Sequence, residues 1–363
     1  IDMTLLLNED QRELQRSLRA MFEKQSDSKR VRAVHEAGDG FDAETWAALV
    51  KLGATTTLIP EAFDGLGLGL TEASIVLEEA GRVIAPVPLY TTLLASAAIR
   101  ATGDLALQAE LLPRIASGET IVALAFTEAA DAWIPVQPDV TATAAGTVTG
   151  AKTFVRDGQF ADFLLVLTAS GLVLVDANAP GVTRTPLGVL DASLFAARVE
   201  FASAAGQVIA VDDLEGFLTE VDATASVLLA AHQYGAYTRA LAITTQYAKD
   251  RFQFGRSIGS FQGVKFPLAA WAMEAELALG ILRQATYLAD TGSAEFVRAA
   301  LTAQVKLQGI SAAGAAWMAR LHGGIGFTWE HDAHLFIKQA KTAQALLGTP
   351  GNRSERLASA LGI

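Results

Sequence analysis

The 363-residue sequence contains no cysteine, and its 28 basic side chains are outnumbered by 39 acidic ones, which gives a formal net charge of −11. The absence of cysteine excludes disulfides, zinc ribbons, thiolate-held iron–sulfur clusters and a thiol nucleophile. Duplex nucleic acid is bound through gathered positive charge, and this sequence has no basic run. We therefore expect no nucleic-acid partner and no cysteine-based centre.

Long uninterrupted apolar runs are also missing, although 51% of the residues are hydrophobic and the mean hydropathy is +0.31. Leu228–Ile243 is among the most apolar segments, but His232 and Arg239 interrupt it, so it falls short of the run of about 18 residues that indicates a membrane span. The chain runs directly into Asn8 and acidic residues, without a signal-peptide pattern. These features predict a cytoplasmic protein without membrane insertion, whose apolar helix surfaces are buried in an oligomer.

Signatures of metal and serine chemistry are equally scarce. His331 and His334 have a helical i, i+3 spacing, but no further ligand lies at a useful distance in the sequence. The G-x-S-x-G match at Gly255–Gly259 lies between two predicted helices and not at the strand-to-helix turn that a serine nucleophile requires. We expect these histidines to be polar residues that open a helix, and we expect no metal site.

The order of predicted elements divides the chain into three blocks. Helical periodicity dominates residues 1–118, short strands separated by Gly, Asp and Asn dominate residues 119–212, and helices return over residues 213–363. Segregated helices and strands are typical of an α+β fold rather than of alternating βαβ units. We therefore predict a mostly α fold with an N-terminal helical domain, a middle antiparallel β-domain and a C-terminal four-helix bundle.

The last block has unusually long predicted helices, since the mean helix in globular proteins has about 11–12 residues. One helix is expected to span Leu214–Asp250 without a break. Two further helices with 3.6-residue apolar periodicity are expected over Gln262–Asp290 and Ala294–Leu321, and a last one over Glu330–Leu347. Consecutive long antiparallel helices favour a bundle.

Two segments between these helices carry recognisable chemistry. Tyr247–Gln262 contains Arg251 at the end of a helix and Phe254 beside a glycine; a guanidinium can bind a pyrophosphate through two bonds, and an aromatic ring can stack on a purine. His322–Glu330 has three glycines in four residues, which lets backbone N–H groups approach an anion. Taken alone, each segment is explained equally well as a turn between helices.

Together these two segments resemble the acyl-CoA dehydrogenase family, and the resemblance covers essentially the whole chain. Further matches are Pro60-Glu-Ala-Phe-Asp-Gly-Leu-Gly67, Phe126-Thr-Glu128, Gly150-Ala-Lys-Thr-Phe-Val155 and Ala161-Asp162. The resemblance implies the three-domain fold and a tetramer. It also implies FAD as cofactor, α,β-desaturation of an acyl-CoA thioester in lipid catabolism, and an electron-transferring flavoprotein as acceptor.

The resemblance also implies roles for seven residues. Those expected to hold the adenosine and pyrophosphate part of FAD, which in this family belongs to a neighbouring subunit, are Arg251, Phe254, Gln262, Gly323 and Gly324. Those expected beside the isoalloxazine ring are Thr127 and Phe154.

Departures from the family pattern concentrate around the ring. The stretch after Thr127-Glu128 reads Ala-Ala-Asp-Ala-Trp instead of a Pro-Gly-Ala-Gly-Ser-Asp-like run. Arg156 stands where the family tends to have Thr or Ser to hydrogen-bond the flavin, and Arg320 replaces a common glutamine. The residues expected to bind the adenosine and pyrophosphate part of FAD are thus kept, while those expected near the isoalloxazine ring are changed.

The catalytic base is missing from both family positions. One position immediately precedes the Gly348-Thr349 pair and holds Leu347, and the other lies 26 residues before Arg251 (251 − 26 = 225) and holds Ala225. Asp222, three residues before Ala225, would lie near the same helix face, about 4.5 Å along the axis. Asp222 is therefore a candidate base; the alternative is a solvated carboxylate or a carboxylate of the helix's N-terminal turns.

Three functions follow. The first is an FAD-dependent acyl-CoA dehydrogenase with its base at an unfamiliar position. The second is a catalytically silent subunit that completes the FAD site of a paralogous partner in a mixed tetramer. The third is a flavin monooxygenase on the same fold, which would not need the base that removes the α-proton.

Overall fold

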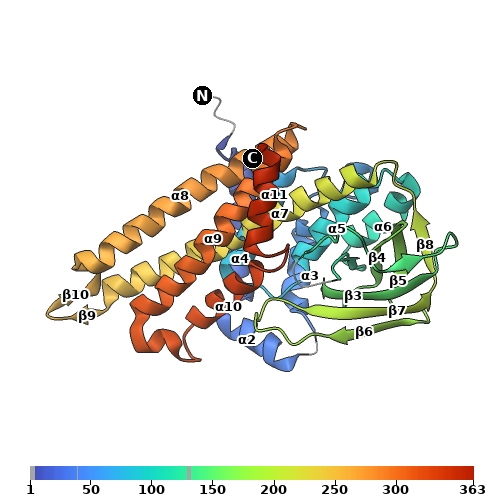
Figure 1. Ribbon diagram of the computed structural model, residues 1–363. Coiled ribbons are helices and arrows are strands. Elements are labelled where there is room, and N and C mark those ends of the chain that lie inside the picture. The colour runs from blue at the N-terminus through green and yellow to red at the C-terminus, as the bar shows by residue number, and fades with distance from the viewer. Residues whose placement is uncertain (1–4, 39, 129–131) are drawn as a thin grey trace.

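The N-terminal block is helical, as expected, in the computed structural model, which describes residues 5–38, 40–128 and 132–363. The first helix begins with a capping box, because the Asn8 side chain accepts from the Gln11 N–H and the Gln11 side chain accepts from the Asn8 N–H. Short 3₁₀ turns join some of the helices (Figure 1). The helices are α1 (Glu9–Gln25), α2 (Ser28–Ala37), α3 (Ala43–Lys51), α4 (Leu70–Val83), α5 (Leu89–Ala101) and α6 (Leu105–Ala116).

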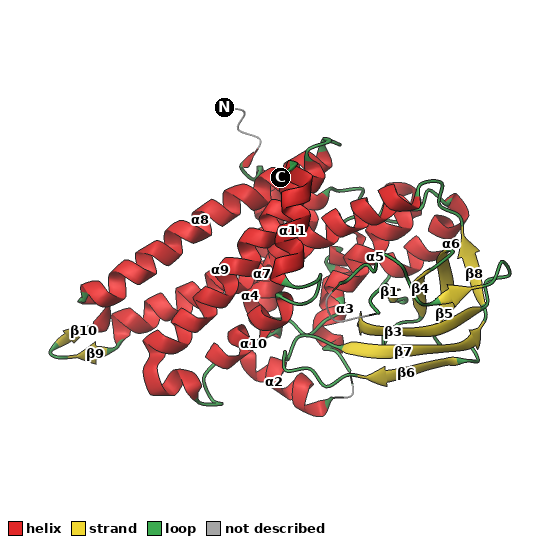
Figure 2. Ribbon diagram, viewed as in Figure 1, coloured by secondary structure: helices red, strands yellow, loops and turns green. Residues whose placement is uncertain are grey.

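The middle block forms two four-stranded sheets that face each other (Figure 2). One sheet has the order β1-β4-β5-β8 and the other β2-β3-β7-β6. The predicted antiparallel pairing is confirmed except between β1 and β4, which run parallel. The strands are β1 (Val122–Ala125), β2 (Thr141–Ala142), β3 (Val148–Arg156), β4 (Phe163–Thr168), β5 (Gly171–Asp176), β6 (Val182–Pro186), β7 (Ala196–Ala204) and β8 (Gly206–Ile209).

The C-terminal block consists of long helices, and none of the described helices is both long and apolar enough to cross a membrane. The first two have the predicted bounds, whereas the last predicted helix is shorter and is followed by an additional one. Thr349 caps that additional helix and Pro350 occupies its first turn. The elements are α7 (Leu214–Asp250), β9 (Phe252–Gln253), β10 (Arg256–Ser257), α8 (Gln262–Asp290), α9 (Phe296–His322), α10 (Ala333–Ala343) and α11 (Pro350–Leu361).

Helix α7 packs against both helical blocks. It crosses α4 closely because glycine stands on each side: a Cβ on Gly235 would lie 1.8 Å from the carbonyl oxygen of Glu78, and a Cβ on Gly81 would lie 2.0 Å from that of His232. One apolar core accordingly includes residues of the N-terminal helices and of the C-terminal helices, while a second lies between the two sheets. The domain boundaries at residues 118 and 212 stay predictions.

Candidate functional site

Arg251 and Phe254 lie at the free end of the bundle, where α7 gives way to a two-stranded hairpin (Figure 1). Arg251 is the residue that ends α7, and its N–H donates to the carbonyl oxygen of Tyr247 at 2.9 Å. Phe254 and Gly255 have φ angles of 54° and 77°, which are the left-handed values that a tight two-residue hairpin requires. The Phe254 side chain is 92% exposed. The hairpin therefore presents an aromatic ring and a guanidinium to the outside of the subunit.

The Gly323–Gly324 turn lies beside the last turns of α7. Tyr247 on α7 stacks on His322 with ring centres 4.3 Å apart, and its hydroxyl donates to the His322 carbonyl oxygen at 3.4 Å. Gly323 has φ 63° and ψ −141°, a conformation that residues with a side chain rarely adopt. Among the described residues, no atom beyond the immediate neighbours lies within 4 Å of a Cβ built on Gly323 or on Gly324. Backbone at this turn is thus open to a ligand or a neighbouring subunit.

This end of the bundle has a positive local charge although the chain is acidic overall. Arg251, Arg256, Lys265 and Arg320 are all exposed, and Gln262, which opens α8, is exposed near them. The Arg256 guanidinium lies 3.9 Å from the centre of the Phe261 ring, which holds it at the base of the hairpin. The predicted tail residues therefore gather at one surface that favours an anion.

Thr127 and Phe154 lie together at the end of the middle domain. The Thr127 carbonyl oxygen accepts from the Thr153 N–H at 2.8 Å, and its hydroxyl donates to the carbonyl oxygen of Trp133 at 3.3 Å. Phe154 has a positive φ of 47° within an irregularity of β3 and is 47% exposed. Of the altered stretch that follows Glu128, residues 129–131 lie outside the described residues.

A cavity of about 30 Å³ separates β3 from α5 and from the segment that follows α10. We call it the ring cavity; its wall includes Phe154, Arg156, Tyr90 and Leu347. The Arg156 guanidinium lies 4.4 Å from the centre of the Tyr90 ring, and the Tyr90 hydroxyl donates to the Ala225 carbonyl oxygen at 3.1 Å. This volume has room for about one water molecule, whereas sites for organic ligands usually measure about 300–1,000 Å³. The residues present do not leave space for a flavin ring.

Both family positions for the base are apolar and buried in the structure. Leu347 is 4% exposed and Ala225 is fully buried. Through the Tyr90 hydroxyl, Ala225 is linked to the wall of the ring cavity. A proton acceptor is therefore missing where the resemblance places it.

Asp222 is not the solvated carboxylate that one interpretation of the sequence expected. Its side chain is 3% exposed and forms ion pairs with Arg353 at 2.8 Å and with Arg356 at 3.0 Å. Arg353, itself fully buried, also donates to Gln304 and to Ser226. Asp222 does not line the ring cavity. Because both of its oxygens contact guanidinium groups, its contacts fit a structural anchor for α11 better than a base.

The sequence interpretation overlooked one carboxyl near the ring cavity. Asp157 is 2% exposed and accepts from the Thr91 hydroxyl at 2.5 Å. Burial raises the pKa of Asp157 to about 6, against the opposing charge of Arg156. Thr91 stands between this carboxyl and the cavity, so Asp157 ties the middle domain to α5. Because an Asp-Gly pair after a strand usually indicates a turn, the sequence pattern gave no reason to expect a contact between Asp157 and Thr91.

Comparison with known proteins decides the family. Models of the acyl-CoA dehydrogenase N-terminal and C-terminal domains match residues 8–119 and 224–361. Acyl-CoA dehydrogenase IpdE2 of Mycolicibacterium smegmatis is 31% identical over 352 residues, which cover 97% of this chain and 98% of the relative. The chain belongs to the acyl-CoA dehydrogenase family.

Solved structures agree with this assignment. A variant of the Tcur3481-Tcur3483 steroid ACAD is 31% identical with a TM-score of 0.88, and 98% of each chain is covered. The ChsE4-ChsE5 complex from Mycobacterium tuberculosis is 27% identical with a TM-score of 0.88, and 99% of this chain and 98% of the other are covered. These comparisons confirm the predicted family and the predicted fold class. They also confirm the expected enzyme class, an oxidoreductase that acts on acyl-CoA.

Proposed function

We propose that this chain is the non-flavin-bearing subunit of a mixed acyl-CoA dehydrogenase tetramer and completes the FAD site of a paralogous partner. One observation carries the proposal. The surface that contains Arg251, Phe254, Gln262, Gly323 and Gly324, which we call the tail surface, is exposed and carries the residues expected to bind FAD. The ring cavity, in contrast, measures only about 30 Å³ and has no base at Ala225 or Leu347. Two relatives support it, because their structures are named for two different chains, Tcur3481-Tcur3483 and ChsE4-ChsE5.

The role of this chain in catalysis is then to hold and orient. Arg251 provides the guanidinium for a pyrophosphate, Phe254 provides a face for the adenine, and the bare backbone of Gly323 and Gly324 provides N–H groups. FAD held by these residues would supply the hydride acceptor for α,β-desaturation of the acyl group. In this proposal the α-proton goes to a carboxylate of the partner, since none of the described residues that line the ring cavity is acidic.

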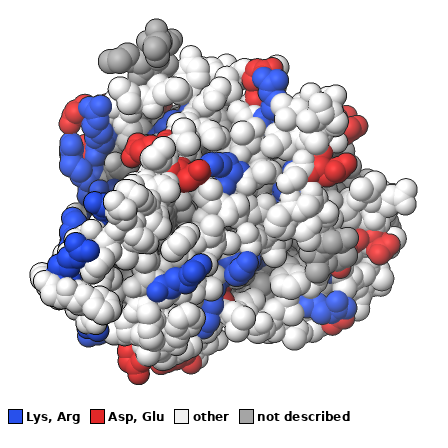
Figure 3. Space-filling view, turned by 60° about the vertical axis from the view of Figure 1, so that its left-hand side comes forward, with Lys and Arg blue, Asp and Glu red and all other residues white. Residues whose placement is uncertain are grey.

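Assembly requires an apolar surface, and α8 has one. Its outward side chains include Phe266, Met273 and Leu277, each more than half exposed. Figure 3 brings the hairpin end of the bundle forward and shows that uncharged side chains make up most of that face. Large exposed apolar areas on a folded chain indicate an interface. We therefore place the partner helices against α8 in the tetramer.

The second candidate is a dehydrogenase that carries its own FAD. The observation in its favour is that Phe154 lines the ring cavity and that Thr127 lies next to it, hydrogen-bonded to the cavity residue Trp133, as the family pattern requires. That candidate requires α5 and β3 to separate when the flavin binds. The contact between Arg156 and Tyr90 opposes such a movement.

We extend the proposal to the substrate and the electron acceptor of the assembly, and the name of one relative supports the choice of substrate. The Tcur3481-Tcur3483 relative is described as a steroid ACAD. We propose an acyl-CoA with a bulky polycyclic group as the substrate of the assembly, and an electron-transferring flavoprotein as its acceptor. Turnover of the assembly with a panel of straight-chain and steroid-derived acyl-CoA thioesters would show which acyl group it prefers.

Flavin content tests the proposal. The chain purified alone should contain no bound FAD, and co-expression with its paralogue should give a mixed tetramer with one FAD per two chains and acyl-CoA-dependent bleaching at the flavin band. One FAD per subunit in the chain alone, reduced by an acyl-CoA, would refute the proposal and establish the second candidate.

A further inference from the structure

The ring cavity continues beyond two of its own side chains. A smaller cavity of about 10 Å³ lies between the end of β3, α7 and α10, and its wall includes the polar residues Asp191, His232 and Gln339. Arg156 and Leu346 belong to the walls of both cavities. These two side chains therefore form a partition that divides one depression into two compartments, each too small for an organic ligand.

Leu346, on one side of this partition, is fixed in place. It lies in the link between α10 and α11, two residues after Gln344. The Gln308 side chain of α9 donates to the Gln344 carbonyl oxygen at 2.6 Å, and the Gln344 side chain donates to the Gln308 carbonyl oxygen at 2.9 Å. Beyond the link, Arg353 anchors α11 through Asp222 at 2.8 Å. Leu346 cannot withdraw from the partition unless these contacts break.

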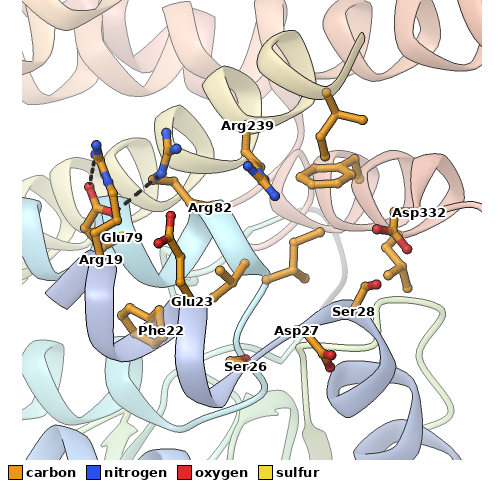
Figure 4. Close-up of a pocket in the computed structure, with 15 residues that line it drawn as sticks. Arg19, Phe22, Glu23, Ser26, Asp27, Ser28, Glu79, Arg82, Arg239 and Asp332 are labelled. Carbon is orange, nitrogen blue, oxygen red and sulfur yellow. Dashed lines mark hydrogen bonds and ion pairs between the residues drawn. The ribbon is translucent and has the colours of Figure 1, made fainter. Parts of the chain in front are cut away.

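Arg156, on the other side, is held by weaker polar contacts. Its Nε is buried without a hydrogen-bond partner within the described part of the chain, and the Asp157 carboxylate lies 3.8 Å from it. An arginine of another cavity shows the usual arrangement, because Arg19 binds the Glu79 carboxylate through two hydrogen bonds of 2.6 and 3.0 Å (Figure 4). Buried polar atoms are nearly always partnered. Polar bonding therefore does not explain why the Arg156 guanidinium lies at the partition.

Strand geometry and packing explain that position instead. Arg156 ends β3, whose register with β7 shifts between Lys152 and Val155, and such an irregularity redirects nearby side chains. Phe154 and Arg156 both line the ring cavity. The guanidinium lies 4.4 Å from the centre of the Tyr90 ring, and the Arg156 side chain is only 15% exposed. Arg156 thus fills the space between the two compartments.

We infer that Arg156 is the residue that keeps a flavin ring out of this chain. A short side chain at this position would join the two compartments and add the space of the arginine to them, in a site whose wall carries Tyr90, Trp133 and Phe154. Aromatic side chains stack on planar rings, so the joined site accepts an isoalloxazine. Because this role of Arg156 rests on the proposed function, in which FAD belongs to the partner, it needs a test that does not depend on the assembly.

Titration of the full chain into lumiflavin, the ring of FAD without its tail, tests the role of Arg156, with quenching of the ring fluorescence as the readout. The wild-type chain should show no saturable binding, whereas Arg156→Ala should bind one ring per chain, at least tenfold more tightly than the wild type. Arg156→Thr is a second opening variant, since β-branched residues suit a strand. Arg156→Met is the matched control, because its unbranched side chain still fills the partition without the charge, and it should behave as the wild type.

Three results would overturn the inference. The first is saturable lumiflavin binding by the wild type, or by neither opening variant although circular dichroism shows both to be folded. The second is loss of the fold in both opening variants, because Arg156 would then be a core residue that folding requires. The third is binding by Arg156→Met as tight as by Arg156→Ala, because charge rather than volume would then exclude the ring.

The FAD content of the wild-type chain tests the proposed function separately. A wild-type chain with one FAD per subunit refutes that function. An FAD-free wild-type chain whose opening variants do not bind lumiflavin refutes only the role of Arg156.

Discussion

Asp222→Asn separates a structural carboxylate from a catalytic one. The substitution leaves Arg353, which is fully buried, without its anion at 2.8 Å. Removal of one partner of a buried ion pair typically costs about 3–5 kcal/mol of unfolding free energy. The pair with Arg356 adds little, because that side chain is 43% exposed and exposed pairs contribute about 0–1 kcal/mol. We expect a loss of about 3–5 kcal/mol in urea unfolding followed by circular dichroism.

The matched control is the double variant Asp222→Asn with Arg353→Met. Replacement of both charges by groups of similar volume is often neutral, so the double variant should recover most of the lost stability, and the double-mutant cycle should give a coupling of a few kcal/mol. Turnover of the assembled dehydrogenase should follow the folded fraction. The reasoning is wrong if Asp222→Asn unfolds like the wild-type chain and the assembly nevertheless loses its turnover, because Asp222 would then be the base.

The folded pKa of Asp157, about 6, lies above the ordinary value of 3.8, so its stabilising effect is complete below pH 3.8 and is lost as the pH rises through 6. The wild-type chain should therefore lose about 3 kcal/mol relative to Asp157→Asn between these limits; parallel pH profiles of unfolding would contradict the assignment. Gly323→Ala should cost about 1–3 kcal/mol because of its positive φ, whereas Gly324→Ala, without a positive φ, should not; equal melting curves would refute this. Arg156→Thr removes the contact with Tyr90 and should lower the unfolding free energy by about 0.5–2 kcal/mol, whereas Arg156→Lys should lose less of it in the same urea titration.

Long continuous helices could be predicted closely from the sequence, whereas two short helices were missed. The bounds of α8 follow from its apolar periodicity, and those of α7 follow from an uninterrupted helical stretch, since much of α7 is buried on all sides. α2 and α11 were not predicted, because each buries a single side chain, Val31 in the first and Arg353 in the second. Their positions are fixed by tertiary contacts, which a local pattern does not encode.

The candidate site divides in the same way. The tail surface was predictable because a positive-φ glycine and an arginine at a helix end are local features. The ring cavity was not, because it depends on Arg156, Tyr90 and Ala225, which come from three different blocks of the chain. Asp222 was misjudged for the same reason, since its partner Arg353 lies 131 residues away in sequence.

The unbroken α7 helix sets the distance between Ala225, at one family position for the base, and Arg251, which is expected to bind the tail of FAD. Ala225 and Arg251 are 26 residues apart (251 − 225) on one helix, or roughly 39 Å at 1.5 Å per residue. Under the proposed function, only the Arg251 end of α7 therefore meets a flavin, which belongs to the partner, while the backbone at Ala225 is bound by the Tyr90 hydroxyl. A lesion at Arg251 should then impair retention of FAD by the partner, whereas a lesion at Ala225 should act on the folding of this chain alone.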